Sequence, residues 1–268
     1  RVSHEEKNKG TDMVIESISA GEDVTAATAP LIFISTLLSH AVSASAGREG
    51  AALQLGGSLG NVIGKAIHLD EKDRKIAIMC GMSAGFAALF GTPLAAGVFA
   101  MEVISIGVMY YAALVPCLFA SFLGAAISGK LGLVPEHYDI GAVPEFGLSG
   151  AVFAVVLGML CACVGIFLCM ILHQCGHLYR KYFPNPYLRV VAGAVIFIGL
   201  TLLFPSRLYN GSGAQIIERV FEGEAIPVYA FLLKILFTGV ALGAGFKGGE
   251  IVPTLTVGAA FGYAVALV

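Results

Sequence analysis

The chain has 268 residues, of which 57% are hydrophobic and only 13% are charged. A soluble domain usually carries about a quarter charged residues, so this composition excludes an ordinary soluble fold and predicts an integral membrane protein. The formal net charge of -2 excludes a general polyanion-binding surface, and we therefore expect no nucleic-acid partner.

The first apolar run, residues 24–46, is long enough to cross a bilayer, which takes about 20 residues. Pro30 lies near its start and is expected to begin or kink the helix. The run ends at Gly47-Arg48-Glu49-Gly50, where two charged residues stand between glycines. A second apolar run, residues 51–64, is too short to cross fully at a rise of about 1.5 Å per residue. This pattern predicts a carboxylate and free backbone N–H groups at a helix start within the depth of the bilayer.

The next stretch, residues 76–129, carries one charged side chain, that of Glu102. A charge at the bilayer centre costs at least roughly 2.5 kcal/mol. Glu102 is therefore expected to be paired, protonated or near an aqueous end, in a role that is either structural or part of transport. Two or three helices fit here, with breaks at Gly91-Thr92-Pro93 and at Gly107 or Pro116.

The second half is a series of apolar segments separated by short polar breaks. The segments expected to be helical are residues 147–179, 188–204, 214–221, 226–245 and a last run that starts near Pro253. A polar glycine loop, residues 209–213, precedes the third of them, and Lys234 is the one charge in the fourth. Both ends of the chain are expected to be cuts through a larger protein.

The order of these features is duplicated. In each half a polar glycine loop precedes a short helix, an acidic connector and an apolar span, which ends at a glycine-rich break with a glutamate: Glu49, then Glu250. Duplicated halves with interrupted helices are typical of transporters whose site lies where the repeats meet. Each helix N-terminus carries roughly half a positive charge, so converging N-termini predict an anion site. We expect one transmembrane domain, with halves of about residues 1–145 and 146–268.

Four segments resemble, in order, the signatures of one family. Gly47-Arg48-Glu49-Gly50, followed by Gln54-Leu55-Gly56-Gly57, is similar to the first anion-binding signature of the CLC chloride channels and proton-coupled antiporters. Residues 91–102, 210–213 and 248–253 are similar to later signatures of that family. The resemblance implies an all-α integral membrane protein with inverted repeats and broken helices. It further implies a multi-pass homodimer in the cell membrane that carries chloride or fluoride, with protons, and needs no cofactor.

Carried over by position, the resemblance makes Glu49 the gating glutamate, whose carboxylate competes with the anion until it is protonated or displaced. It also implies a set of residues that line the anion sites, mainly through backbone N–H groups. The members of this set are Lys9, Gly47, Arg48, Gly50, Gly249, Glu250, Ile251 and Val252. Lys9 stands where the family's first-half loop usually offers a serine, and a solvated loop residue is the other interpretation of it.

Three positions depart from the family pattern. Val103 lies where proton-coupled chloride members place a relay glutamate, which favours a channel or a branch with different proton coupling. Glu250 replaces an apolar residue, as in the fluoride-exporting branch, whereas Val252 occupies that branch's threonine position. The first hypothesis is therefore a voltage-gated-type chloride channel or chloride/proton antiporter, and fluoride/proton exchange is the alternative.

Two other classes of function were weighed. His173 and His177 have the spacing of a zinc-binding helix, but the metalloprotease signature needs a glutamate where Gln174 stands. An intramembrane metalloenzyme is thus a remote alternative, and we expect neither an enzyme nor a metal site. A cation or amino-acid carrier would need carbonyl-rich or acidic sites instead of converging helix N-termini. The six cysteines all lie in apolar segments, where we expect small, buried, unpaired residues.

Overall fold

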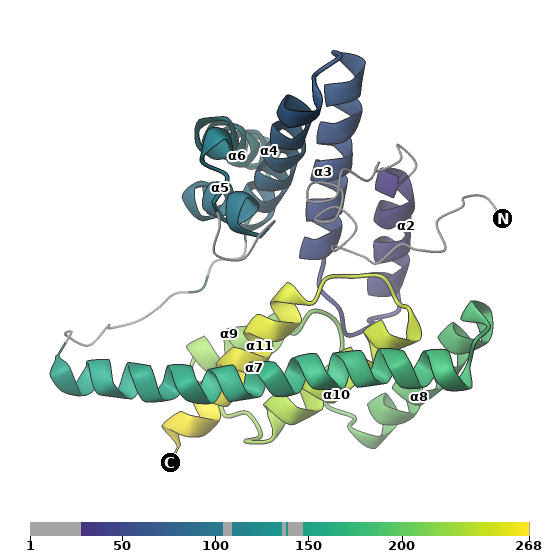
Figure 1. Ribbon diagram of the computed structural model, residues 1–268. Coiled ribbons are helices and arrows are strands. Elements are labelled where there is room, and N and C mark those ends of the chain that lie inside the picture. The colour runs from purple at the N-terminus through teal and green to yellow at the C-terminus, as the bar shows by residue number, and fades with distance from the viewer. Residues whose placement is uncertain (1–27, 104–108, 136–137, 139–146, 268) are drawn as a thin grey trace. The chain divides into compact units, whose positions relative to one another are not determined.

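The computed structural model describes residues 28–103, 109–135, 138 and 147–267 (Figure 1). These residues are helical apart from their connections, and their β pairing is confined to one isolated bridge, which confirms the all-α prediction. The elements are α2 (Thr28–Ala41), α3 (Glu49–Ala66), α4 (Glu71–Phe90), α5 (Pro93–Glu102), the 3-10 turn η1 (Tyr111–Ala113), α6 (Leu114–Lys130), α7 (Leu148–Tyr182), α8 (Pro186–Leu203), α9 (Ala214–Phe221), α10 (Ala230–Ala244) and α11 (Ile251–Ala266).

The described residues form two compact units. The first contains residues 28–36 and 49–135, and the second contains residues 37–48, 138 and 147–267. Most of the second unit follows residue 137 in the sequence. The second unit, however, also includes the end of α2 and the connection that leads to α3. A segment of the first half in sequence thus belongs to the second unit in space.

Helices α3 and α4 of the first unit pack closely because glycines face backbone atoms on both. A Cβ added to Gly56 would collide with the carbonyl oxygen of Gly81, and a Cβ added to Gly81 would collide with that of Gly56. Gly60 approaches the backbone of Ala77 in the same way. Small residues allow helices in a membrane to gain contact by close approach, since lipid is as apolar as a leucine side chain.

The break between α4 and α5 has the local chemistry expected of it. Helix α4 ends at Gly91, whose φ of 67° is left-handed and whose N–H donates to the carbonyl oxygen of Ala87. Pro93 then occupies the start of α5, where its missing N–H removes a donor that has no intrahelical acceptor. Glycine after one helix and proline at the start of the next therefore produce the predicted interruption.

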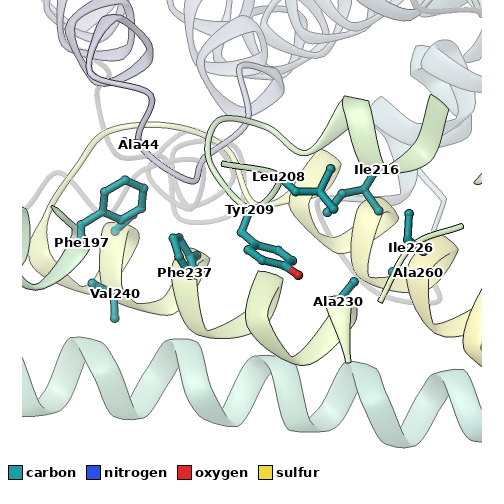
Figure 2. Packing of buried hydrophobic residues seen from close by; sticks show 11 residues of the cluster. Ala44, Phe197, Leu208, Tyr209, Ile216, Ile226, Ala230, Phe237, Val240 and Ala260 are labelled. Atoms are coloured by element: carbon teal, nitrogen blue, oxygen red, sulfur yellow. The ribbon is translucent and has the colours of Figure 1, made fainter. Parts of the chain in front are cut away.

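In the second unit, α10 is the central helix and contacts α7, α8 and α11 (Figure 1). Its Phe237 lies between Phe197 and Tyr209, with ring centroids 5.5 Å from each (Figure 2). The same hydrophobic cluster includes Ala44 from the connection after α2 and Ile216 from α9. This shared core explains why the connection after α2 belongs to the second unit.

Three helices of the described chain are long and apolar enough to cross a membrane: Tyr111–Lys130, Leu148–Tyr182 and Pro186–Leu203. The apolar run 24–46, expected to span, is helical only in part. The described part of this run contains helix α2, whose 14 residues extend about 21 Å at a rise of about 1.5 Å per residue. The helix ends at Ala41, just before Ser43, whose left-handed φ of 55° is not helical and whose carbonyl oxygen accepts from Gly211.

The expectation that the cysteines are buried is wrong for two of them. Cys117 is buried, but Cys163 and Cys169 are exposed on α7, and all six cysteines are free thiols that form no disulfide. The surface of α7 is apolar along most of its 35 residues. An exposed thiol on such a helix faces the same surroundings as its exposed leucine and valine neighbours.

Candidate functional site

Two interruptions between helices meet in the second unit. We call residues 42–48, between α2 and α3, the first break, and residues 245–250, between α10 and α11, the second break. The N–H of Gly47 donates to the carbonyl oxygen of Gly249 at 2.7 Å, and the N–H of Gly249 donates to that of Gly47 at 2.6 Å. The two glycine-rich motifs singled out in the sequence are therefore held together by their backbones.

Small residues make this close approach possible. A Cβ on Gly248 would lie 2.5 Å from the Cβ of Ala46 and 2.8 Å from the carbonyl oxygen of Gly47. The second break is also linked to the last turn of α2, because the N–H of Lys247 donates to Ser39 Oγ at 3.0 Å. Any larger residue at position 248 would force the breaks apart.

The glycine loop, residues 209–213, joins the same assembly. The N–H of Gly211 donates to the carbonyl oxygen of Ser43 at 3.0 Å. Ser43 has a φ of 55°, an uncommon conformation for a residue with a side chain, which turns its carbonyl away from the helical direction. The first break is thus held by the glycine loop at one end and by the second break at the other.

A buried lysine side chain donates hydrogen bonds to the first break and to the glycine loop. The side chain of Lys234, in α10, is 0% exposed. Its Nζ donates to Ser45 Oγ at 2.9 Å, to the carbonyl oxygen of Gly211 at 2.8 Å and to that of Tyr209 at 3.2 Å. Ser45 Oγ also lies 3.0 Å from Thr238 Oγ1. One ammonium group therefore bonds both the first break and the glycine loop.

Each break leads directly into a helix N-terminus. Helix α11 begins at Ile251 after the N-cap residue Glu250, whose side chain forms no cap hydrogen bond and is exposed. The N–H groups of Ile251 and Val252 have no acceptor within the helix, as in any first turn, and Pro253 has no N–H. The N-terminus of α11 therefore presents a small group of donors with the positive end of the helix dipole.

The two charged residues at the start of α3 differ in burial. Arg48 is exposed, whereas the side chain of Glu49 is 0% exposed. Glu49 is the first residue of α3, where the N–H groups of the first turn have no intrahelical acceptor. A buried carboxylate at a helix N-terminus is electrostatically favoured, because it faces the positive end of the dipole.

The predicted site residues are therefore placed as follows. Gly47, Arg48, Gly249, Glu250, Ile251 and Val252 lie at or next to the bridge in the second unit. Glu49 and Gly50 follow directly in the chain, at the start of the first unit's α3. Glu102 is the exposed last residue of α5, at a helix end, and Lys9 lies outside the described residues. Because the N–H groups of Gly47 and Gly249 are used in the bridge, these glycines hold the two breaks together.

Sequence reasoning noted Lys234 only as an isolated charge and missed it as part of this assembly. Its signal was a single charged residue within an apolar helix, since intramembrane ionisable residues are usually functional. The buried partners Ser45 and Thr238 had no signal of their own, because isolated hydroxyl residues are common in membrane helices.

The metalloenzyme alternative gains no support from the structure. His173 and His177 are both exposed on α7. Among the described residues, no group of three or more His, Cys, Asp or Glu side chains is close enough to hold a metal ion.

The sequence and the fold are both similar to those of known proteins. The chain is 34% identical over 264 residues to a chloride/fluoride channel protein of Pseudomonas syringae pathovar tomato, covering 96% of this chain and 58% of the relative. The crystal structure of a CLC-type fluoride/proton antiporter matches with a TM-score of 0.90 and 34% identity, covering 95% of this chain and 64% of that one. A slow cyanobacterial Cl⁻/H⁺ antiporter shares the fold, with a TM-score of 0.80 and 22% identity over 96% of this chain and 62% of that one.

The chain thus spans about three fifths of the length of these proteins. The family described as voltage gated chloride channel matches residues 1–268. The order of the four signature segments, the helical fold with its two joined breaks and this match along the whole sequence agree: the chain belongs to the voltage-gated chloride channel family, the CLC family.

Proposed function

We propose that the full protein of which this chain forms part transports a small halide across the cell membrane, with Glu49 as its gating residue. The observation that carries the proposal is the pair of hydrogen bonds between Gly47 and Gly249. These bonds join the two breaks that lead into α3 and α11. An anion at the N-terminus of α11 would be bound by backbone N–H groups and by the dipole of that helix, which replace part of its hydration shell.

Gating by Glu49 follows from competition. Its carboxylate is buried at the N-terminus of α3, among the kind of N–H groups that would bind a halide. The carboxylate and the halide carry the same charge and accept hydrogen bonds from the same donors. Protonation removes the competitor's charge, so proton binding favours release of the carboxylate and admission of the anion.

Fluoride is the favoured substrate and chloride the second candidate. The solved structure at 34% identity is described as a fluoride/proton antiporter, and the Pseudomonas relative as a chloride/fluoride channel. Glu250, at the N-cap of α11, also places an acidic residue in the second break. In the family resemblance, an acidic residue at this position is a feature of the fluoride-exporting branch. Protons as the coupled ion, a lipid bilayer as the surroundings and a homodimer as the assembly complete the proposal.

The test is flux from liposomes that contain the purified full-length protein. We expect efflux of fluoride and of chloride to depend on pH, with the greater rate for fluoride, and we expect Glu49→Gln to abolish that pH dependence. Glu222→Gln, which changes an exposed residue at the end of α9, is the matched control. Absence of halide flux in the unmodified protein would overturn the transport function. Unaltered pH dependence in Glu49→Gln would overturn the gating role alone.

A further inference from the structure

Lys234 is a charged side chain that the proposed function leaves without a role, because the anion contacts it invokes are backbone N–H groups. The lysine lies in the second turn of α10 and is 0% exposed. Removing an ammonium ion from water costs several kcal/mol, which good hydrogen bonds must offset. An ionisable residue within a membrane segment is by default connected with the substrate path.

Lys234 bonds to two loops, the glycine loop and the first break. An ammonium group has three donors and no acceptor. Its bonds to the carbonyl oxygens of Tyr209 and Gly211 fix the glycine loop, and its bond to Ser45 Oγ fixes the first break two residues before the bridged Gly47. One side chain therefore sets the distance between the glycine loop and the first break.

The direction of the bonds extends this network. Because Lys234 can only donate, Ser45 Oγ accepts, and the Ser45 hydroxyl proton is available for Thr238 Oγ1 at 3.0 Å. Thr238 lies one turn after Lys234 on α10 and is also 0% exposed. Hydrogen bonds in such a buried chain polarise one another, so the positive charge is felt beyond the ammonium itself.

The aliphatic part of the Lys234 side chain is packed as closely as its ammonium group. A Cβ on Gly213, whose φ is 96°, would lie 2.8 Å from Lys234 Cε and 2.7 Å from Thr256 Oγ1. Thr256 lies on α11, whose N-terminus follows the second break. The lysine is thus held between Gly213, the last residue of the glycine loop, and α11, the helix that follows the second break.

We propose that Lys234 is a positioning residue of the anion path, and that its buried positive charge sets the affinity for the anion without touching it. This inference rests on the proposed function and adds a fixed cation to it. The ammonium holds the glycine loop and the first break in place. Its field acts over several ångströms, because charges in the protein interior are screened far less than in water.

The experiment measures fluoride flux in liposomes for the full-length protein and for Lys234→Met, which keeps the length of the stem without the charge. We expect the KM for fluoride to rise by about tenfold or more in Lys234→Met, the effect of losing a nearby unit charge in a weakly screened site. Lys234→Arg, which keeps the charge, should restore a KM close to that of the unmodified protein. Glu222→Gln, which changes an exposed residue at the end of α9 outside this network, is the control and should leave the KM unchanged.

The outcomes separate the two proposals. The Lys234→Met protein is first checked for folding by size-exclusion chromatography. If it folds and keeps the original KM, the charge of Lys234 does not set the affinity for the anion, and the inference is overturned. If that variant does not fold, Ser45→Ala decides, because it removes the link to the first break and leaves the lysine in place. An unchanged KM in Ser45→Ala would then overturn the inference. Loss of flux in the unmodified protein would instead overturn the proposed function.

Discussion

Gly47 and Gly249 come from opposite halves of the sequence and form a symmetrical pair, in which each N–H donates to the other's carbonyl oxygen. A pair of this kind normally begins a sheet, but here both strands stop after one residue. Each segment leads directly along the chain into a helix, α3 after the first break and α11 after the second. The bridge therefore acts as a fixed point from which two helices start, and the proposed site depends on it.

Substitution of Gly248 tests whether transport needs this fixed point. In Gly248→Ala the new methyl group would meet Ala46 Cβ at 2.5 Å and the carbonyl oxygen of Gly47 at 2.8 Å, so the breaks must separate. We expect halide flux to fall by about tenfold or more, the consequence of losing roughly 1.4 kcal/mol at the site. Gly258→Ala in α11, where a Cβ has no neighbour within 4 Å, should keep its flux. Equal flux in the two variants would contradict a role of the bridge in transport.

Two residues of the glycine loop, Gly211 and Gly213, allow the cost of backbone strain to be compared with the cost of steric crowding. Gly211 and Gly213 both have positive φ, at 64° and 96°, but a Cβ has no neighbour within 4 Å at Gly211 and meets Thr256 and Lys234 at Gly213. Gly211→Ala should lower the free energy of unfolding by about 1–2 kcal/mol through backbone strain alone. Gly213→Ala should lower the free energy of unfolding further, because its methyl group must also displace Thr256 and Lys234. Thermal unfolding in detergent measures both, and an equal decrease would count against the close packing around Lys234.

Two helical glycines, one in each unit, give predictions of opposite sign. Gly81→Ala places a methyl group against the carbonyl oxygen of Gly56 and must separate α3 from α4. Gly158→Ala, on α7, meets no atom within 4 Å, and alanine is a better helix former than glycine by roughly 1 kcal/mol. The melting temperature should therefore fall for Gly81→Ala and stay level or rise for Gly158→Ala. A stable Gly81→Ala protein would show that the close contact of α3 and α4 is not needed.

Several features were predictable from sequence because they depend on local chemistry. Apolar composition identified a membrane protein, and the long uninterrupted run at residues 147–179 predicted α7. Glycine and proline placed the break between α4 and α5, and they placed the start of α11 near Pro253. The order of the signature segments was enough to indicate the CLC family. Each of these follows from the properties of a few neighbouring residues.

The sequence by itself therefore determined the membrane class, the positions of the helix breaks and the family. The tertiary structure decided that α2 stops at Ala41, that Gly47 pairs with Gly249 and that Lys234 bonds both Ser45 and the glycine loop. The physical reason is the range of the interactions. Hydrophobic length and backbone propensity act between neighbours along the chain. Hydrogen bonds such as that of Lys234 to Ser45 act between residues that only folding brings together, and no local pattern specifies which donor meets which acceptor.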